Sequence, residues 1–148
     1  MQVESFWSLW THLNQPSTLQ ATTDYLLFKN TIRRPVWEDP LNIDGGKWII
    51  RLRKGVADRL WEDLVLAIIG DQFDGLGTRE EGSDPTTGDD EICGCTISVR
   101  GGEDILAIWN KNGSDTKTTT RIKCVSHFPV LDQKPDHTRT QRNYKAGT

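Results

Sequence analysis

Hydrophobic residues near the start of the chain recur at the spacing of an amphipathic helix. Residues 3–13 are predicted to be helical, with one apolar stripe at positions three and four residues apart. This stripe consists of Phe6, Leu9 and Leu13, with Trp10 at its edge. Val3 and Trp7 form a second stripe, about 100° round the same helix. One stripe is enough to bury a helix, so Trp7 either widens the buried face or is exposed and available to a partner.

A second helical period covers residues 56–69 and ends at Gly70, a residue that suits a helix C-terminus. Its broad inner face consists of Leu60, Trp61, Leu64, Val65, Ile68 and Ile69. Leu66 lies on the opposite side of this helix, near acidic residues. One exposed Leu needs no explanation, but Leu66 and an exposed Trp7 would form a patch if the two helices lie side by side.

Four segments carry patterns typical of β-strands. Residues 25–28 form a short apolar run that contains two aromatic side chains. Residues 47–53 alternate strictly between an apolar face and a largely basic face. The apolar face consists of Trp48, Ile50 and Leu52. Residues 91–100 and 104–109 predict the two strands of a hairpin that turns at Gly101-Gly102.

Alternation within this hairpin assigns several side chains to a face of the sheet. The side chains predicted to point inward are Cys93, Cys95, Ile97 and Val99. Burial therefore explains the Cys-x-Cys spacing without a metal. Arg100 falls on the open face, whereas alternation alone does not decide the face of Trp109.

Three further segments lack these periods. Residues 73–90 are rich in Gly, Asp and Thr and predict a mobile acidic loop. Ser114 and Asp115 can cap a short helix that runs to Ile122, although three consecutive threonines make it a poor one. Residues 123–148 follow no period and carry two prolines and scattered basic residues. We expect a disordered basic tail there.

The segment 35–40 combines an aromatic ring and a carboxylate on a stiff loop. Pro35 and Pro40 restrict the backbone, so Trp37 and Glu38 are held side by side. An indole can stack on a planar base, and a carboxylate accepts two hydrogen bonds, which matches the N1–H and N2–H donors of guanine. A 7-methyl group would make the base cationic and add roughly 0.5–2 kcal/mol of cation–π attraction. The alternative is an ordinary half-buried aromatic beside a solvated charge.

Composition narrows the class of function. The 148 residues suit one domain, and the net charge of −3 means that nucleic-acid binding would need a local basic patch. No apolar run reaches the length of a membrane span, and the first residues lack the pattern of a signal peptide. The three cysteines and three histidines have no zinc-ligand spacing, which favours reduced thiols in the cytosol and neither metal nor cofactor. Glu38-Asp39 has no partner acid at a useful spacing and no nucleophile–base pattern occurs, so we do not expect an enzyme.

Seven short motifs follow one another in an order that resembles the mRNA cap-binding translation initiation factor 4E family, over residues 3–122. They are Val-Glu-x-Phe-Trp at 3–7, Trp-Glu-Asp at 37–39, Gly-Gly-Lys-Trp at 45–48, the helix with Trp61 that ends at Ile69-Gly70, Ile-Cys-Gly at 92–94, Ser-Val-Arg at 98–100 and Ile-Trp-Asn-Lys at 108–111. The details at 61–64 and 108–111 are similar to its divergent branch, the 4E-homologous protein.

The resemblance implies an α+β fold, a curved antiparallel sheet backed by helices, with 7-methylguanosine held on the concave face between two aromatic rings. Trp37 would supply one ring, and Glu38 would read the guanine. Trp109 would contact the 7-methyl group. Arg100 would bind the cap phosphates, where a charge-assisted hydrogen bond is favourable, and Lys47 would support it.

The resemblance also implies a convex surface made of Val3, Trp7 and Leu66. This surface would bind a Tyr-x-x-x-x-Leu-Φ helix of initiation factor 4G or of a translational repressor. We therefore expect a cytoplasmic monomer, not membrane-bound, that binds capped mRNA in translation initiation or its repression. The alternative is an interaction module that sequesters 4E-binding partners through this surface and binds cap poorly.

Three departures from the family pattern stand out. The family has a strand and a loop before Val3, and that loop carries the second stacking ring. A second phosphate-binding basic residue is replaced by Ile105, as in the divergent branch. The family continues after Ile122 with a longer helix and further strands, which residues 124–148 do not match. We therefore expect a partial domain over residues 1–122, incomplete at both ends.

Overall fold

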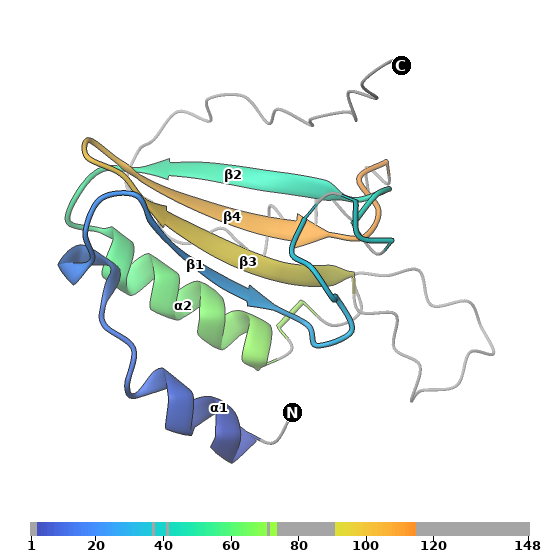
Figure 1. Cartoon of the computed structure of the whole chain (residues 1–148), viewed down its shortest axis with the longest axis horizontal. Helices are drawn as coiled ribbons and strands as arrows, with labels where there is room; N and C mark the ends of the chain where they lie inside the picture. The colour runs from blue at the N-terminus through green and yellow to red at the C-terminus, as the bar shows by residue number, and fades with distance from the viewer. Residues whose placement is uncertain (1–2, 37, 41, 71, 74–90, 115–148) are drawn as a thin grey trace.

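The computed structural model of the protein describes residues 3–36, 38–40, 42–70, 72–73 and 91–114 (Figure 1). Its elements are α1 (Val3–Trp10), the 3₁₀ turn η1 (Pro16–Thr18), β1 (Thr23–Phe28), β2 (Gly46–Leu52), α2 (Ala57–Ile69), β3 (Ile92–Val99) and β4 (Asp104–Asn110). Neither of the described helices is long and apolar enough to cross a membrane. The predicted helix after Ser114, nearly all of the predicted acidic loop and the predicted tail lie outside the described residues.

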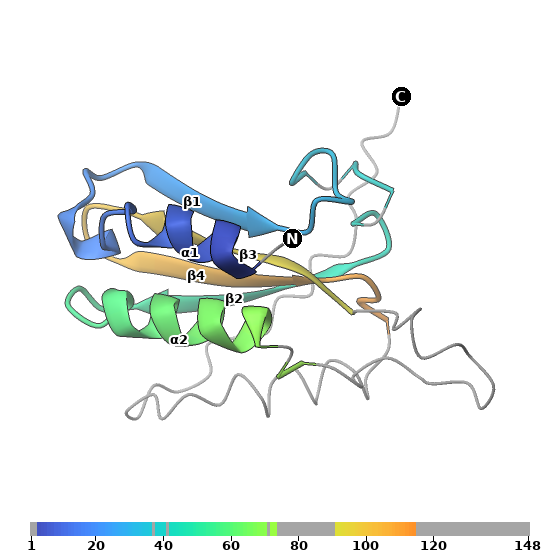
Figure 2. The same ribbon diagram turned by 90° about the horizontal axis from the view of Figure 1, so that it is seen from below.

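The four described strands form one antiparallel sheet in the order β1-β3-β4-β2. The β3–β4 hairpin therefore lies at the centre, with β1 and β2 on either side. Figure 2 shows α2 along one face of this sheet and the connection between β1 and β2 on the other side. We call the side covered by α2 the helix face and the opposite side the open face. The predicted class, an α+β fold with an antiparallel sheet backed by helices, is confirmed.

The hydrophobic core fills the space between the helix face and the helices. Its buried members include Leu52, Trp61, Leu64, Val65, Cys95, Ile97, Leu106 and Ile108. The alternation predicted for residues 47–53 is confirmed, because Trp48 and Ile50 pack against this core beside Leu52. The predicted end of α2 is confirmed as well: the Gly70 N–H donates to the Leu66 carbonyl at 2.8 Å.

Helix α1 is shorter than predicted and packs through a different set of side chains. It ends at Trp10, and the N–H groups of His12 and Leu13 then donate to carbonyls three residues back, a tighter turn than the α-helix. Of the predicted stripe only Phe6 is buried, whereas Leu9 is 64% exposed and Leu13 is 40% exposed. Trp10, predicted at the edge of the stripe, lies 6.5 Å from the Trp61 ring and packs against the core.

Strand β3 contains an irregularity that reverses one predicted side chain. The register against β4 shifts between Ile92 and Gly94, as in a β-bulge, which places an extra residue in one strand. As a result Cys95 faces α2, but Cys93 packs on the open face with Trp109. The prediction that Cys93 points into the same core as Cys95 is therefore wrong. Burial raises the pKa of Cys93 to about 11, and that of Cys95 rises for the same reason.

Candidate functional site

Glu38 lies on the connection between β1 and β2, and buried polar side chains hold this connection in shape. Asp39 is buried, and its Oδ2 accepts a hydrogen bond from the Arg34 N–H at 3.3 Å. Asn42 is also buried; its Nδ2 donates to the Val36 carbonyl at 2.9 Å, and its N–H donates to the Asp39 carbonyl at 2.8 Å. Glu38 itself is exposed. The exposed carboxylate of Glu38 therefore lies on a loop whose backbone is held by the hydrogen bonds of Asp39 and Asn42.

A small hydrophobic cluster joins the base of this connection to the open face of the sheet. It consists of Ile32, Cys93, Trp109 and Phe28. The ring of Trp109 packs edge-on against Phe28, with centroids 5.6 Å apart and planes at 69°. Trp109 is only 6% exposed, which places it under the open face as part of the floor of the site. Its face, which alternation left undecided, is thus settled by packing.

Lys47 lies over the Trp109 ring, with its ammonium 4.8 Å from the ring centroid. The two residues are register partners on neighbouring strands, so the sheet itself brings them together. A cation at this distance from an indole is attracted by the ring. Burial lowers the pKa of Lys47, although the charge of Asp24 acts in the opposite direction. The strand pairing therefore places the Lys47 amine directly above the floor of the site.

Arg100 follows the last residue of β3 and forms an ion pair across the sheet. Its Nη1 donates to Asp24 Oδ1 at 2.8 Å and to the Val99 carbonyl at 3.0 Å. This hydrogen bond from Arg100 holds the pKa of Asp24 below its usual value; Ser98 and the charge of Lys47 act in the same direction. We did not predict Asp24, although alternation along β1 could have placed it on the open face.

The structure gathers the predicted residues at two places on the open face. Lys47 and Trp109 touch each other beside the Glu38 connection. Arg100 lies at the other end of β3. Trp109 pairs with Gly94, and Arg100 follows Gly94 by six residues, or about 20 Å along the strand. The prediction for Trp37 falls outside the described residues.

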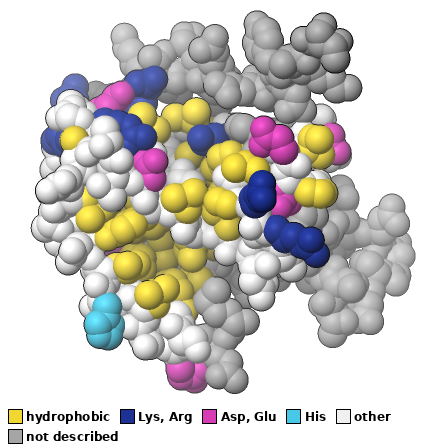
Figure 3. All heavy atoms as spheres, in the orientation of Figure 1, with side chains coloured by type: hydrophobic (Ala, Val, Ile, Leu, Met, Phe, Trp, Pro, Cys, Tyr) yellow, Lys and Arg dark blue, Asp and Glu magenta, His cyan; other side chains and the backbone are white. Residues whose placement is uncertain are grey.

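Hydrophobic and charged side chains both occur on the open side of the sheet. In Figure 3 hydrophobic side chains gather over the strands, and basic and acidic groups lie beside them. Leu26 on β1 is 52% exposed and Ile49 on β2 is 40% exposed. An apolar floor, cations and an exposed carboxylate together suit a flat, polar-edged ligand that carries negative charge.

The three residues that the resemblance assigns to a partner-binding surface are exposed in the structure. Val3 is 57%, Trp7 40% and Leu66 36% exposed. The two helices run side by side in both Figure 1 and Figure 2, and the Trp10 and Trp61 rings join them on the inner side. The sequence left two interpretations of Trp7 open, and the structure favours the exposed one.

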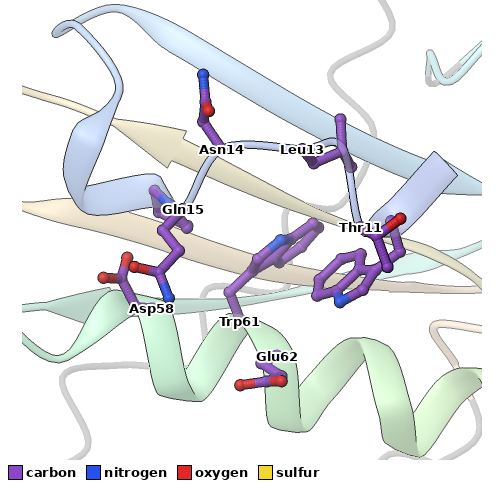
Figure 4. Close-up of a pocket in the computed structure, with 9 residues that line it drawn as sticks. Thr11, Leu13, Asn14, Gln15, Asp58, Trp61 and Glu62 are labelled. Atoms are coloured by element: carbon purple, nitrogen blue, oxygen red, sulfur yellow. The ribbon is translucent and has the colours of Figure 1, made fainter. Parts of the chain in front are cut away.

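A cavity of about 320 Å³ lies between the end of α1, η1 and α2. Figure 4 shows the ring of Trp61 among the side chains that line it, with Asp58 and Glu62 on α2. Asp58 is already engaged, because its carboxylate accepts hydrogen bonds from the Ser17 N–H at 2.8 Å and hydroxyl at 2.6 Å. This cavity is on the side of the helices and takes no part in the site around Glu38.

Comparison with known proteins connects these features to a family. The family model described as eukaryotic initiation factor 4E matches residues 1–146, so the match includes most of the tail that we expected to fall outside the resemblance. Eukaryotic translation initiation factor NCBP of Triticum aestivum is 46% identical over 140 residues, which cover 90% of this chain and 54% of the relative. Eukaryotic translation initiation factor 4E-4 of Caenorhabditis elegans is 45% identical over 155 residues, covering 99% of this chain and 66% of the relative. The chain thus spans between about half and two thirds of the length of these relatives.

Solved structures agree with the fold. The complex of Caenorhabditis elegans eIF4E-3 with the 4E-binding protein Mextli and cap analog has a TM-score of 0.71 and 35% sequence identity. Ascaris suum eIF4E-3 in complex with m2,2,7G cap has a TM-score of 0.72 and 33% identity. In both comparisons 84% of this chain and 64% of the other chain are covered.

Proposed function

The chain belongs to the eukaryotic initiation factor 4E family, and we propose that its open face binds the 7-methylguanosine cap of mRNA in translation or its repression. The observation that carries this proposal is the exposed Glu38 on a loop held by Asn42, whose base packs through Ile32 against Trp109. Lys47 lies over the Trp109 ring. The carboxylate of Glu38 accepts from guanine N1–H and N2–H, while Trp37 stacks on the base. The cap complex of the Ascaris relative supports this assignment.

Because Trp109 is buried, it suits contact with the 7-methyl group better than stacking on the base. A stacking platform must present a whole ring face, but Trp109 is 6% exposed and its surroundings include Phe28 and Lys47. The part that remains accessible suits contact with a small group such as the 7-methyl group. Arg100 and Lys47 supply the positive charge for the phosphates, which form strong charge-assisted hydrogen bonds with such groups.

The direct test is retention of the whole chain on immobilised 7-methyl-GTP. We expect free 7-methyl-GTP to release the bound protein, and we expect GTP at the same concentration to release far less, because the cationic base stacks more strongly. Equal release by the two nucleotides would contradict recognition of the methylated base.

A second candidate function rests on the exposed surface of Val3, Trp7 and Leu66. An amphipathic Tyr-x-x-x-x-Leu-Φ helix would place its apolar face on this surface, as helices do in hydrophobic grooves. The partner would be an initiation factor 4G-like protein or a translational repressor. The complex of the Caenorhabditis elegans relative with the 4E-binding protein Mextli supports such a partner. A chain with this surface and weak cap affinity would sequester partners.

Replacing Trp7 with alanine separates the two surfaces. We expect affinity for a Tyr-x-x-x-x-Leu-Φ peptide to fall at least about thirtyfold, because central aromatic residues of interfaces contribute 2 kcal/mol or more. Retention on 7-methyl-GTP should stay the same, because α1 packs through Phe6 into the core on the helix face, whereas the Glu38 connection lies on the other side of the sheet. Peptide binding is measured by titration calorimetry.

Leu9→Ala is the matched control, since Leu9 is 64% exposed on the same helix and lies outside the proposed surface. It should leave peptide affinity within about twofold of the parent, as expected for a surface substitution. A large drop in the melting temperature of Trp7→Ala without selective loss of peptide binding would favour a core role for Trp7.

A further inference from the structure

Asp24 lies on the open face of the sheet, in contact with Arg100. Its carboxylate accepts a hydrogen bond from Arg100 Nη1 at 2.8 Å, and these two side chains are 44% and 38% exposed, respectively. Ser98 is its register partner on β3, and Ser98 and the positive charge of Lys47 both act to lower the pKa of this carboxylate. The negative charge of Asp24 therefore lies next to Arg100, the side chain that would bind the phosphates of a ligand.

This carboxylate opposes an anionic ligand even if Arg100 keeps its present partner. A guanidinium has five N–H donors, so Arg100 can donate to Asp24 and to a phosphate at the same time. Asp24 then stays next to the phosphate, and the repulsion between like charges grows with the charge of the ligand. A ligand without phosphate does not experience this repulsion.

We propose that Asp24 is a specificity-determining residue that limits the affinity gained with each phosphate of the ligand, an inference that rests on the proposed cap-binding function. Its hydrogen bond holds Arg100 over the open face, while its charge offsets one of the nearby positive charges. Recognition of the base through Glu38 then contributes a larger share of the total affinity. Triphosphates that lack the methylated base gain correspondingly less from the site.

Asp24→Asn tests the charge while it keeps the geometry, because the amide retains an acceptor oxygen for Arg100 and nearly the same size. The ligands are 7-methylguanosine and its mono-, di- and triphosphate, titrated by quenching of tryptophan fluorescence. We expect the variant to bind the triphosphate about three- to tenfold more tightly than the parent at low ionic strength, with smaller gains for fewer phosphates. Affinity for 7-methylguanosine should not change, and that result also reports correct folding.

Glu62→Gln is the matched control, since it makes the same change in net charge at an exposed position on α2. It should change the affinity for every ligand by less than about twofold, and high salt should reduce the gain of Asp24→Asn, because exposed charges are screened. Equal affinities of parent and Asp24→Asn across the series would overturn the inference. So would a loss of affinity that increases with phosphate number, or the same graded gain in Glu62→Gln.

Inorganic triphosphate, titrated in parallel and followed by NMR of the arginine side chains, separates this inference from the proposed function. Tighter binding of inorganic triphosphate to Asp24→Asn, with no binding of the 7-methylguanosine series by the parent, would refute cap binding and support the role of Asp24. Binding of the series with no graded effect of Asp24→Asn would refute the role of Asp24 alone. Absence of binding by every ligand would refute both.

Discussion

Trp109→Ala is expected to lower the free energy of unfolding by about 3–5 kcal/mol, the usual cost of truncating a buried aromatic side chain. The ring is 6% exposed and joins the base of the Glu38 connection, through Ile32, to Cys93 on β3. Its loss leaves a cavity at the point where that connection is attached to the sheet. For a chain of this size the melting temperature should fall by roughly 6–20 °C, measured by circular dichroism. Retention on 7-methyl-GTP should be lost as well, because Lys47 loses the ring under its ammonium.

Trp109→Phe and Trp7→Ala serve as controls for this result. Phenylalanine refills part of the space beside Phe28 and should recover part of the stability. Trp7 is 40% exposed, so its truncation should cost much less than that of Trp109, since the cost follows the area buried. A melting temperature of Trp109→Ala within a degree or two of the parent would show that the cluster does not hold the connection in place.

Glu38→Ala is expected to abolish selective binding of the cap base. A bidentate pair between a side chain and a base is worth about 1–3 kcal/mol of discrimination, which corresponds to roughly a tenfold to hundredfold loss of affinity for 7-methyl-GTP. Glu38 is exposed, and the buried Asp39 and Asn42 hold its loop, so the variant should keep the stability of the parent. Fluorescence titration with 7-methyl-GTP measures the affinity, and thermal melting measures the stability.

The control for Glu38 is Asp44→Ala, which removes another exposed carboxylate from the same connection. It should bind 7-methyl-GTP as the parent does, so that loss of negative charge near the site is separated from loss of base recognition. If Glu38→Ala bound 7-methyl-GTP as tightly as the parent, the assignment of this loop to the guanine edge would be wrong.

Local sequence patterns determined the elements of this protein and part of its candidate site. The alternation over residues 47–53, the helical period that ends at Gly70 and the hairpin over residues 91–109 all depend on near neighbours in the chain, and the structure agrees with each. The same reasoning placed the Glu38 carboxylate on a loop, because it needed only the adjacent prolines and side-chain chemistry.

The tertiary structure decided the features that depend on distant segments. The bulge after Ile92 turns Cys93 to the open face, and only packing against Ile32 shows that Trp109 lies there too. Asp24 and Arg100 are 76 residues apart and meet because β1 pairs with β3. Periodicity describes which way a side chain points along one element. The order of the strands, and therefore the partner of each charge, follows from burying all the apolar faces at once.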